Sequence, residues 1–487
     1  MTGRKNPRIA LLPLDERPVT AHLPAQIAAV AGAETIQPPA AIMPRGRAPG
    51  DCEALGTWLN DVARTCDLSV ISLELLGLGG LIPSRIGHEP VDEILRRWQV
   101  VRELPTPVFA SAVVLRTPDA DDADEEPPYY AEFGRALHAT SAVLALDGQP
   151  DKVVPHDVAS DFFGRRLRNH ILNLAAVGMA LDGSIDHLVL GADDTATEAV
   201  GTAEQAWISR WQRWLGLDER ASTYPGADEI GAVLVARALA AQIDGWTPEV
   251  ALHAHDGLHR VAPYENVPVE ATVMGQLRGL GAALAVEPRS ADLHLVVHPP
   301  ATRAGDFATA PPATTDIDAA EATTRIVMDL LDRGCPVAVA DCAYANGADP
   351  ALVGALGTAL GGQWDALAGY AGWNTAGNSI GTALAHGIAK TVGELSGTLD
   401  RAAHQKLIMH RLLEDWGWMS SARAAVRRQL DSDPSRHDRV PADGSAELLA
   451  TELLTERLMW LDDRWRLSGV AFPWSRTFEI DFGLTQL

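Results

Sequence analysis

Two adjacent carboxylic acids, Asp193 and Asp194, form a candidate acid/base pair. They directly follow the short apolar run at residues 187–192, which predicts a buried strand. Because two neighbouring acids cannot both lose their protons cheaply, their pKa values are pushed apart, and one acid and one anion result. The alternative, a strand-end acid that caps the next helix beside a solvated neighbour, stays open at this point.

Polar side chains also follow several other apolar runs, and we expect them to contact a substrate. Ligands of parallel α/β proteins bind at the carboxyl ends of the strands, where the loops vary while the sheet stays rigid. The substrate-binding residues predicted on this basis are Asp15, Arg17, Glu74, Arg85, Asn169, Asn173, Asp228, Glu229, Asp341, Asn346, Trp373, Asn374 and Asn378.

Some of these residues also have a simpler structural interpretation. Asn169 and Asn173 share one face of a predicted helix, and that face can equally be an exposed stripe. Asp228 and Glu229 open another helix, where the helix dipole favours acids in any case. Asn378 can cap the helix that follows it. These alternatives stay open at the level of sequence.

The segment at residues 369–381 is unusual because it combines an indole with two amides before an apolar helix. An aromatic face together with amide groups is how proteins hold a polyhydroxylated ring. Trp373, Asn374 and Asn378 are therefore predicted to bind a sugar.

Two further segments have a predicted place in the structure. The acidic run at residues 119–128 ends in two prolines, and like charges so close together predict a solvated loop. Trp474, Arg476 and Glu479, near the C-terminus, are candidates to reach back to the main domain.

The elements that must position these residues are those of an α/β fold. The predicted strands start near residues 8, 67, 107, 187, 249, 292, 336 and 369, if a weak strand at 34–37 is discounted. Eight strands alternating with helical segments predict a (β/α)8-barrel-like or related parallel-sheet domain. We expect residues 1–390 to form this catalytic domain and residues 391–487 to form a mainly helical C-terminal domain or cap.

Composition excludes several function classes. The 487 residues are 47% hydrophobic and carry a formal charge of −24, which argues against a nucleic-acid partner. No apolar stretch approaches the roughly 18 residues of a membrane span, and no secretion signal is recognised. The four cysteines lack a CxxC spacing, so neither a disulfide scaffold nor a zinc knuckle is indicated. The sequence predicts a cytoplasmic protein with a small-molecule substrate and no cofactor, and leaves a homo-oligomer open.

Several motifs together resemble a bacterial family known as domain of unknown function 4127. They are Pro-Leu-Asp-Glu-Arg-Pro-Val at 13–19, Leu-Gly-Gly-Leu-Ile-Pro-Ser-Arg at 78–85, Arg-Asn-His at 168–170 with Asn173, Gly-Ala-Asp-Asp at 191–194, Tyr-Pro-Gly-Ala-Asp-Glu at 224–229, Asn-Gly-Ala-Asp at 346–349 and Ala-Gly-Trp-Asn-Thr-Ala-Gly-Asn at 371–378. The resemblance spans nearly the whole chain and departs at Glu74, where an Asp is expected. It implies no activity.

A second resemblance concerns chemistry. The acids at the end of the fourth of the eight strands resemble in position the paired Asp of O-GlcNAcase-type hexosaminidases, which are barrel enzymes. That resemblance implies that Asp194 protonates the leaving oxygen while Asp193 polarises the acetamido group of the substrate. The predicted function is hydrolysis of a glycoside on a small sugar conjugate, with an N-acetylamino sugar as the candidate substrate.

Two other functions remain open from the sequence. The first is a metal-dependent hydrolase or lyase that uses Asp194, Asp341 and the strand-end histidines 253, 255 or 298. The second is a carbohydrate-binding protein without turnover.

Overall fold

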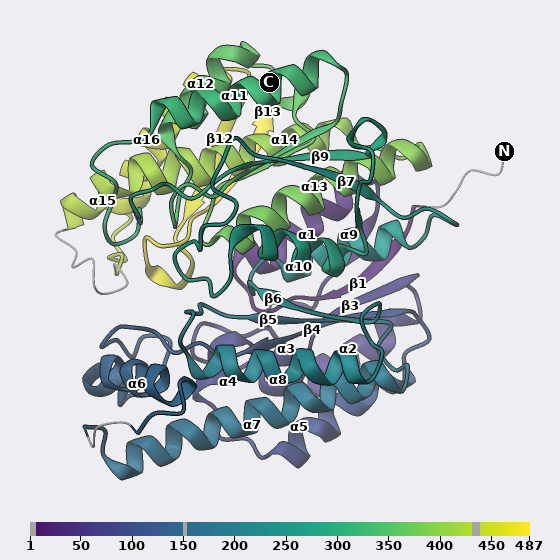
Figure 1. Ribbon diagram of the computed structural model, residues 1–487, viewed down its shortest axis with the longest axis vertical. Coiled ribbons are helices and arrows are strands. Elements are labelled where there is room, and N and C mark those ends of the chain that lie inside the picture. The colour runs from purple at the N-terminus through teal and green to yellow at the C-terminus, as the bar shows by residue number, and fades with distance from the viewer. Residues whose placement is uncertain (1–5, 150–152, 431–438) are drawn as a thin grey trace.

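Two open parallel sheets organise the molecule, and the computed structural model describes residues 6–149, 153–430 and 439–487 of it (Figure 1). The six-stranded sheet has the order β2-β1-β3-β4-β5-β6. Its strands are β1 (Arg8–Leu12), β2 (Glu34–Ile36), β3 (Leu68–Ser72), β4 (Val108–Val114), β5 (His187–Ala192) and β6 (Ala221–Pro225). The five-stranded sheet has the order β11-β10-β9-β7-β8. Its strands are β7 (Glu249–His253), β8 (Ala283–Leu284), β9 (Leu293–His298), β10 (Val337–Asp341) and β11 (Gly369–Ala371).

The α/β class is confirmed, and the parallel-sheet alternative describes the arrangement of the strands. All eight predicted strands are present, but they are divided between two sheets, so the described strands form no closed barrel. The discounted run at 34–37 contains β2, and β6 and β8 were not predicted. Apolar runs identify strands because parallel strands are buried on both faces. Such runs do not determine which strands pair, so they could not distinguish a closed barrel from two separate sheets.

Four helices fill the space between the two sheets: α1 (Pro18–Val30), α9 (Ile230–Ala240), α10 (Val269–Leu280) and α13 (Ala376–Ser396) (Figure 1). Alternate residues of each strand contribute to this central core or to an outer one. On β5, for example, Val189 belongs to the central core, whereas Leu188 and Leu190 belong to the outer core. Each sheet is therefore covered on both faces.

The outer helices complete this layered structure. In the half with the six-stranded sheet they are α2 (Cys52–Ala63), α3 (Leu73–Leu78), α4 (Leu81–Ile86), α5 (Val91–Arg97), α6 (Tyr130–Ala145), α7 (His156–Leu181) and α8 (Val200–Trp214). In the other half, α11 (Ile317–Asp332) and α12 (Pro350–Leu360) pack on the five-stranded sheet. Short 3-10 helices are η1 (Trp98–Glu103), η2 (Pro288–Ser290), η3 (Trp364–Ala366) and η5 (Pro473–Ser475). No helix of the described residues is both long and apolar enough to cross a membrane.

The C-terminal part is mainly helical and shares a hydrophobic core with the five-stranded sheet. It consists of α14 (Arg401–Leu412), the π-helix η4 (Leu413–Ala422), α15 (Arg423–Leu430), α16 (Ser445–Leu461) and the hairpin of β12 (Trp465–Ala471) with β13 (Asp481–Gln486). Trp418 and Phe482 from this part join Val339 of β10 in one core. Helix α13 crosses residue 390, and the domain division at that residue stays a prediction.

Small residues allow α13 to lie directly against the five-stranded sheet, and this close contact is testable. A Cβ added at Gly369 of β11 would lie 2.6 Å from the backbone oxygen of Ala383, which the helix holds in place. Gly369→Ala should therefore lower the free energy of unfolding by about 1–3 kcal/mol. Gly354 of α12 has no atom within 4 Å of such a Cβ, and Gly354→Ala should stabilise by about 0.5–1 kcal/mol. Denaturant unfolding measures both; equal values would contradict the packing.

Candidate active site

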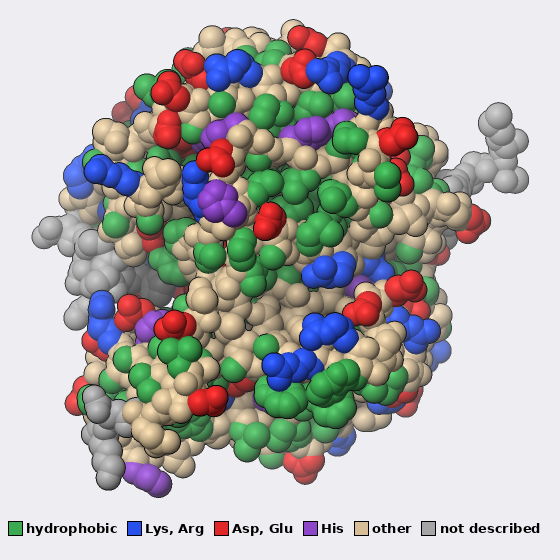
Figure 2. Space-filling view, in the orientation of Figure 1, with side chains coloured by type: hydrophobic (Ala, Val, Ile, Leu, Met, Phe, Trp, Pro, Cys, Tyr) green, Lys and Arg blue, Asp and Glu red, His purple; other side chains and the backbone are tan. Residues whose placement is uncertain are grey.

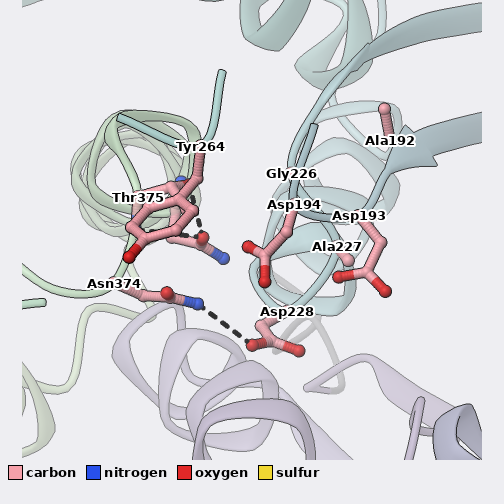
Figure 3. Close-up of a pocket in the computed structure, with 10 residues that line it drawn as sticks. Ala192, Asp193, Asp194, Gly226, Ala227, Asp228, Tyr264, Asn374 and Thr375 are labelled. Carbon is pink, nitrogen blue, oxygen red and sulfur yellow. Dashed lines mark hydrogen bonds between the residues drawn. The ribbon is translucent and has the colours of Figure 1, made fainter. Parts of the chain in front are cut away.

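A small polar pocket lies where the carboxyl ends of β5 and β6 face the N-terminus of α13 (Figure 3). Its empty volume, part of which is open to solvent, is about 240 Å³. It is lined by Ala192, Asp193, Asp194, Gly226, Ala227, Asp228, Tyr264, Asn374, Thr375 and Asn378. Five of the predicted site residues therefore meet here from three distant segments of the chain.

Glycines allow the two strand ends to come together beneath the pocket. The N–H of Gly226 donates to the carbonyl of Ala192 at 2.9 Å, which continues the pairing of β5 with β6. A Cβ at Gly191 would lie 2.2 Å from the oxygen of Gly226, so that position has no room for a side chain. Gly226 itself has a φ of 132°, which L residues rarely adopt. This close approach of the two strand ends places Asp194 and Asp228 at the same pocket.

The N-terminus of α13 brings amides to the opposite wall. Thr375 is the N-cap and forms a reciprocal capping box with Asn378. Asn378 also donates from Nδ2 to Oε2 of Glu229 at 3.0 Å, so it has the capping role as well as a place in the lining. Asn374 donates to Oδ2 of Asp228 at 3.3 Å (Figure 3). The cap thus fixes both amides relative to the acids.

Asp194 is the carboxyl group with the properties of a general acid. Its side chain is 31% exposed and accepts from Nη1 of Arg116 at 3.0 Å. Partial burial, together with the charge of Asp193, raises the pKa of Asp194 to about 6, although Arg116 and Arg85 oppose this. Asp193 is only 9% exposed and is paired with Nη2 of Arg85 at 2.5 Å. The two adjacent acids therefore have different partners and different access to solvent.

Arg17 fixes the third acid of the pocket, Asp228. Its Nη2 lies 2.6 Å from Oδ1 of Asp228 and 2.8 Å from Oδ2 of Asp15. Burial raises the pKa of Asp228, and the charge of Arg17 opposes that rise. Asp15 and Arg17 do not line the pocket, but they hold Asp228 from behind.

Buried carboxyl groups also lie beneath the amide wall. Glu229 is fully buried and accepts from Gln276 at 2.7 Å as well as from Asn378. Burial raises the pKa of Glu229 to about 8. Glu265 accepts from the backbone N–H of Gly377 at 2.6 Å, and burial raises its pKa to about 7. Both groups support α13 and have no place in the pocket lining.

The acidic run at 119–128 was predicted to be a solvated loop, and this prediction is wrong for Glu125 and Glu126 near the end of the run. Glu125 and Glu126 are buried. Glu125 accepts from Arg85 at 2.6 Å and from Arg116 at 3.0 Å, and Glu126 accepts from Arg116 at 2.8 Å. These arginines also bind the acids of the pocket, which is why two further carboxylates can be buried beside them. Arg116, Glu125 and Glu126 are functional candidates that the sequence interpretation missed.

The C-terminal segment reaches back to this cluster, as expected for Trp474, Arg476 and Glu479. Arg476 is ion-paired with Glu125 and, through Nη2 at 2.6 Å, with Glu479. Two guanidinium groups lie over the Trp474 ring, that of Arg476 at 4.6 Å and that of Arg17 at 4.9 Å from its centroid. This segment therefore covers the arginine side of the site.

Three predicted substrate-binding residues instead support strand β4 behind the pocket. The side-chain amides of Asn169 and Asn173 both donate to the carbonyl of Val113, at 2.9 and 3.2 Å. Glu74 accepts from the N–H of Val113 at 2.7 Å. All three side chains are buried and outside the pocket lining, so neither the exposed-stripe alternative nor a direct contact with a pocket ligand describes them.

Trp373, Asp341 and Asn346 also lie outside the pocket lining. The indole of Trp373 is buried in the central core, and its N–H donates to Thr382 at 3.2 Å, so it is not available as a sugar platform. Asp341 is buried at the end of β10, where it accepts from the N–H of Asp349 at 2.6 Å. Asn346 supports the pocket indirectly, because its N–H donates to the carbonyl of Asn374 at 2.7 Å.

The aromatic ring that does line the pocket belongs to Tyr264, which no sequence pattern indicated (Figure 3). Its hydroxyl donates to Asp306 at 2.6 Å, and its carbonyl accepts from Thr195 at 2.9 Å. Tyr264 and Asn374 both have a positive φ, of 66° and 48°. Such backbone strain in non-glycine residues is concentrated at functional sites.

The strand-end histidines do not join the pocket acids. His253 stacks on His294 with ring centroids 5.1 Å apart, and His298 pairs with Asp349 at 3.1 Å. Among the described residues, no group of three or more His, Cys, Asp or Glu side chains is placed to hold a metal ion.

The buried position of Glu125 can be tested by removing its carboxylate. Glu125→Ala leaves Arg85, Arg116 and Arg476 short of a buried partner and should cost about 3–5 kcal/mol of unfolding free energy. Glu132, an exposed acid on α6, provides the control, and Glu132→Ala should change stability by less than about 0.5 kcal/mol. Similar losses in the two variants would contradict the assignment.

Glu74 predicts a defined dependence of stability on pH. Burial raises the pKa of Glu74 to about 7, above the roughly 4.3 of an unfolded chain. The folded state then binds more protons than the unfolded state between these values, so stability is lost as pH rises through about 7. Glu74→Gln replaces the titrating carboxyl group with an amide, so the variant should lack this loss. The melting temperature of the variant minus that of the wild type should therefore increase between pH 5 and pH 8. A constant difference would contradict the raised pKa.

Comparison with known families agrees with the resemblance noted from the motifs. A search of curated proteins and a search of solved structures each gave no match. A family model described as protein of unknown function (DUF4127) matches residues 9–483, from the second residue of β1 to the third residue of β13. The chain therefore belongs to the DUF4127 family.

Proposed function

We propose that the protein is a hydrolase that cleaves a glycosidic bond in a small sugar conjugate. The observation that carries this proposal is the pairing, in one polar pocket, of a solvent-accessible acid of raised pKa, Asp194, with a second carboxyl group, Asp228. Glycoside hydrolysis commonly uses two carboxyl groups, one to protonate the leaving oxygen and one to act as a base or nucleophile.

Asp194 is the general acid in this proposal. A pKa of about 6 lets it keep its proton in mildly acidic solution and release it to a leaving oxygen. Arg116, at 3.0 Å, stabilises the carboxylate that remains after proton transfer. The side chain of Asp194 is 31% exposed, so a ligand in the pocket can reach its carboxyl group.

Asp228 takes the role of the second carboxyl group. Figure 3 shows its carboxyl group and that of Asp194 directed at the same space, with Asn374 beside them. The fork of Arg17 favours the ionised form of Asp228. Asp193, which was expected to be the polarising carboxylate, is held by Arg85 and acts in this proposal through the pKa of Asp194.

The remaining lining suits a hydroxylated ring. The Tyr264 ring supplies an aromatic face, and Asn374, Thr375 and Asn378 supply hydrogen-bonding groups on the wall that faces the acids. An N-acetylamino sugar is the candidate substrate, because its acetamido N–H can donate to Asp228. The reaction in this form needs no cofactor.

The role of Asp194 predicts a large loss of activity in its amide variant. On a panel of chromogenic α- and β-linked hexosides and N-acetylhexosaminides, the wild type should hydrolyse at least one substrate. Asp194→Asn should lower kcat for that substrate by about 10²–10⁴, because an amide cannot protonate the leaving oxygen. Asp61→Asn, an exposed change on α2, should leave kcat unchanged. Turnover of none of the panel, or full activity of Asp194→Asn, would contradict the proposal.

The same assignment predicts the alkaline limb of the pH profile. A general acid must carry its proton, so kcat/KM should fall tenfold per pH unit above about pH 6, as Asp194 ionises. Arg116→Met removes a charge that lowers the pKa of Asp194 and should move this limb to higher pH. An unchanged limb in that variant would show that another group controls it.

A further inference from the structure

The wall of the active-site pocket that faces the acids comes from the loops of the five-stranded sheet. Tyr264 lies in the segment after β7, and Asn374 and Thr375 lie in the segment after β11. Figure 3 shows these three residues on one side of the pocket, across from Asp194 and Asp228. The two acids follow β5 and β6 of the six-stranded sheet. The shape of the pocket therefore depends on how the loops of the five-stranded sheet are held together.

A buried acid, Asp306, belongs to a third loop of this sheet, the one that follows β9. Acidic side chains are scattered over the face of the molecule seen in Figure 2, as expected of solvated acids, whereas Asp306 is only 8% exposed. It is not part of the pocket lining. Burying a carboxylate costs free energy unless its oxygens accept hydrogen bonds, so the donors around Asp306 explain its position.

Four donors surround the carboxylate of Asp306. Its Oδ2 accepts from the hydroxyl of Tyr264 at 2.6 Å and from that of Thr309 at 2.8 Å. Its Oδ1 accepts from the backbone N–H of Ala308 at 2.7 Å and from Nδ2 of Asn346 at 2.9 Å. An ionised carboxylate only accepts, and these four bonds use both of its oxygens. Burial and the charge of Asp306 raise the pKa of Tyr264, so the tyrosine hydroxyl keeps its proton and donates.

Two of these donors connect Asp306 to the pocket. Tyr264 lines the pocket itself. Asn346 donates from its backbone N–H to the carbonyl of Asn374 at 2.7 Å, and Asn374 also lines the pocket. Asp306 thus joins the loops after β7, β10 and β11 into one wall.

The residues linked in this way have strained backbones. Tyr264, Asn346 and Asn374 have positive φ values of 66°, 57° and 48°. Residues other than glycine keep such angles only where the surrounding contacts enforce them, and they are concentrated at functional sites. The hydrogen bonds of Asp306 are among the contacts that hold Tyr264 and Asn346 in place.

The loop that carries Asp306 is itself fixed on two sides. The N–H of Phe307 donates to the carbonyl of Ala345 at 3.0 Å, which pairs this loop with the one after β10. From the C-terminal part, Nη1 of Arg427 donates to the carbonyl of Ala308 at 2.5 Å. Asp306 therefore has a defined position from which it can orient its partners.

We propose that Asp306 is a positioning residue of the active site, which fixes Tyr264 and Asn374 and thereby determines how tightly the pocket holds the ring of its substrate. This proposal rests on the function proposed above. Because Asp306 acts on the wall that faces Asp194, its loss should weaken binding and leave the proton of Asp194 in place. Weaker binding of ground state and transition state alike raises KM and leaves kcat unchanged.

Steady-state kinetics on a glycoside that the wild type hydrolyses test this role. Asp306→Ala should raise KM about tenfold or more and change kcat by less than about threefold. Asp306→Asn should restore a KM near that of wild type, because its amide can accept from Asn346 and donate to the Tyr264 hydroxyl. Arg303→Ala, an exposed change in the same loop, should leave KM unchanged. An unchanged KM in Asp306→Ala, or an equally raised KM in Asp306→Asn, would overturn the proposal.

Tyr264→Phe tests the same link from the pocket side, and does so even if Asp306→Ala fails to fold. The variant keeps the ring but loses the bond to Asp306, so KM should rise about threefold with kcat unchanged. Adding Tyr264→Phe to Asp306→Ala should raise KM no further, because the hydroxyl acts through Asp306. An unchanged KM in Tyr264→Phe, or additive effects in the double variant, would contradict this link.

Nitrogen NMR of ¹⁵N-asparagine-labelled protein tests the positioning without a substrate. The signals of Asn374 are assigned as those absent from Asn374→Asp. They should shift in Asp306→Ala, return towards their wild-type positions in Asp306→Asn and stay in place in Arg303→Ala. Unmoved Asn374 signals in a folded Asp306→Ala variant would overturn the proposal. If the panel contains no substrate, the proposed function fails, whereas this measurement still decides the role of Asp306.

Discussion

A buried network of ion pairs between four arginines and a larger number of carboxylates is the interaction on which the candidate active site depends. The arginines are Arg17, Arg85, Arg116 and Arg476, and the carboxylates paired with them are Asp15, Asp193, Asp194, Asp228, Glu125, Glu126 and Glu479. They come from the segments that follow β1, β3, β4, β5 and β6, and from the C-terminal segment. Buried charges are tolerated only when paired, so these segments are held together by their charges.

The excess of acids over arginines explains why protons remain in the cluster. Seven carboxylates cannot all be neutralised by four guanidinium groups, and burial adds a further cost to each charge. The pKa values of Asp194, Asp228 and Glu126 are accordingly raised, with burial as the largest cause in each case. Of these three groups, Asp194 has the most exposed side chain. The same charge balance that stabilises the site thus supplies an accessible proton.

The central helical layer decides which residues meet the acids. Helix α13 runs between the two sheets and is capped by Thr375, so the amides of Asn374 and Asn378 come from the far half of the chain to face β5 and β6. Strain at Asn374 and Tyr264 is maintained by contacts with neighbouring loops. The pocket therefore exists only when both halves are folded together.

The sequence was sufficient for eight strands of the two parallel sheets and for the acids that end several of them, because apolar runs and strand-end polar groups are local features. It could not distinguish a barrel from two sheets, since pairing between β5 and β6 or between β7 and β9 depends on distant residues. Glu125 resembled a solvated acid because its arginine partners lie in three separate segments. Trp373 seemed a better ligand platform than Tyr264 because composition does not reveal which ring faces a cavity.

The most direct test of the account is the protonation of Asp194 itself. Carbon NMR of protein labelled with ¹³C at the aspartate carboxyl groups, with the signal assigned by its absence from Asp194→Asn, follows this titration. The account predicts a midpoint near pH 6 for Asp194. A midpoint near 4, the ordinary value for an aspartate, would contradict it.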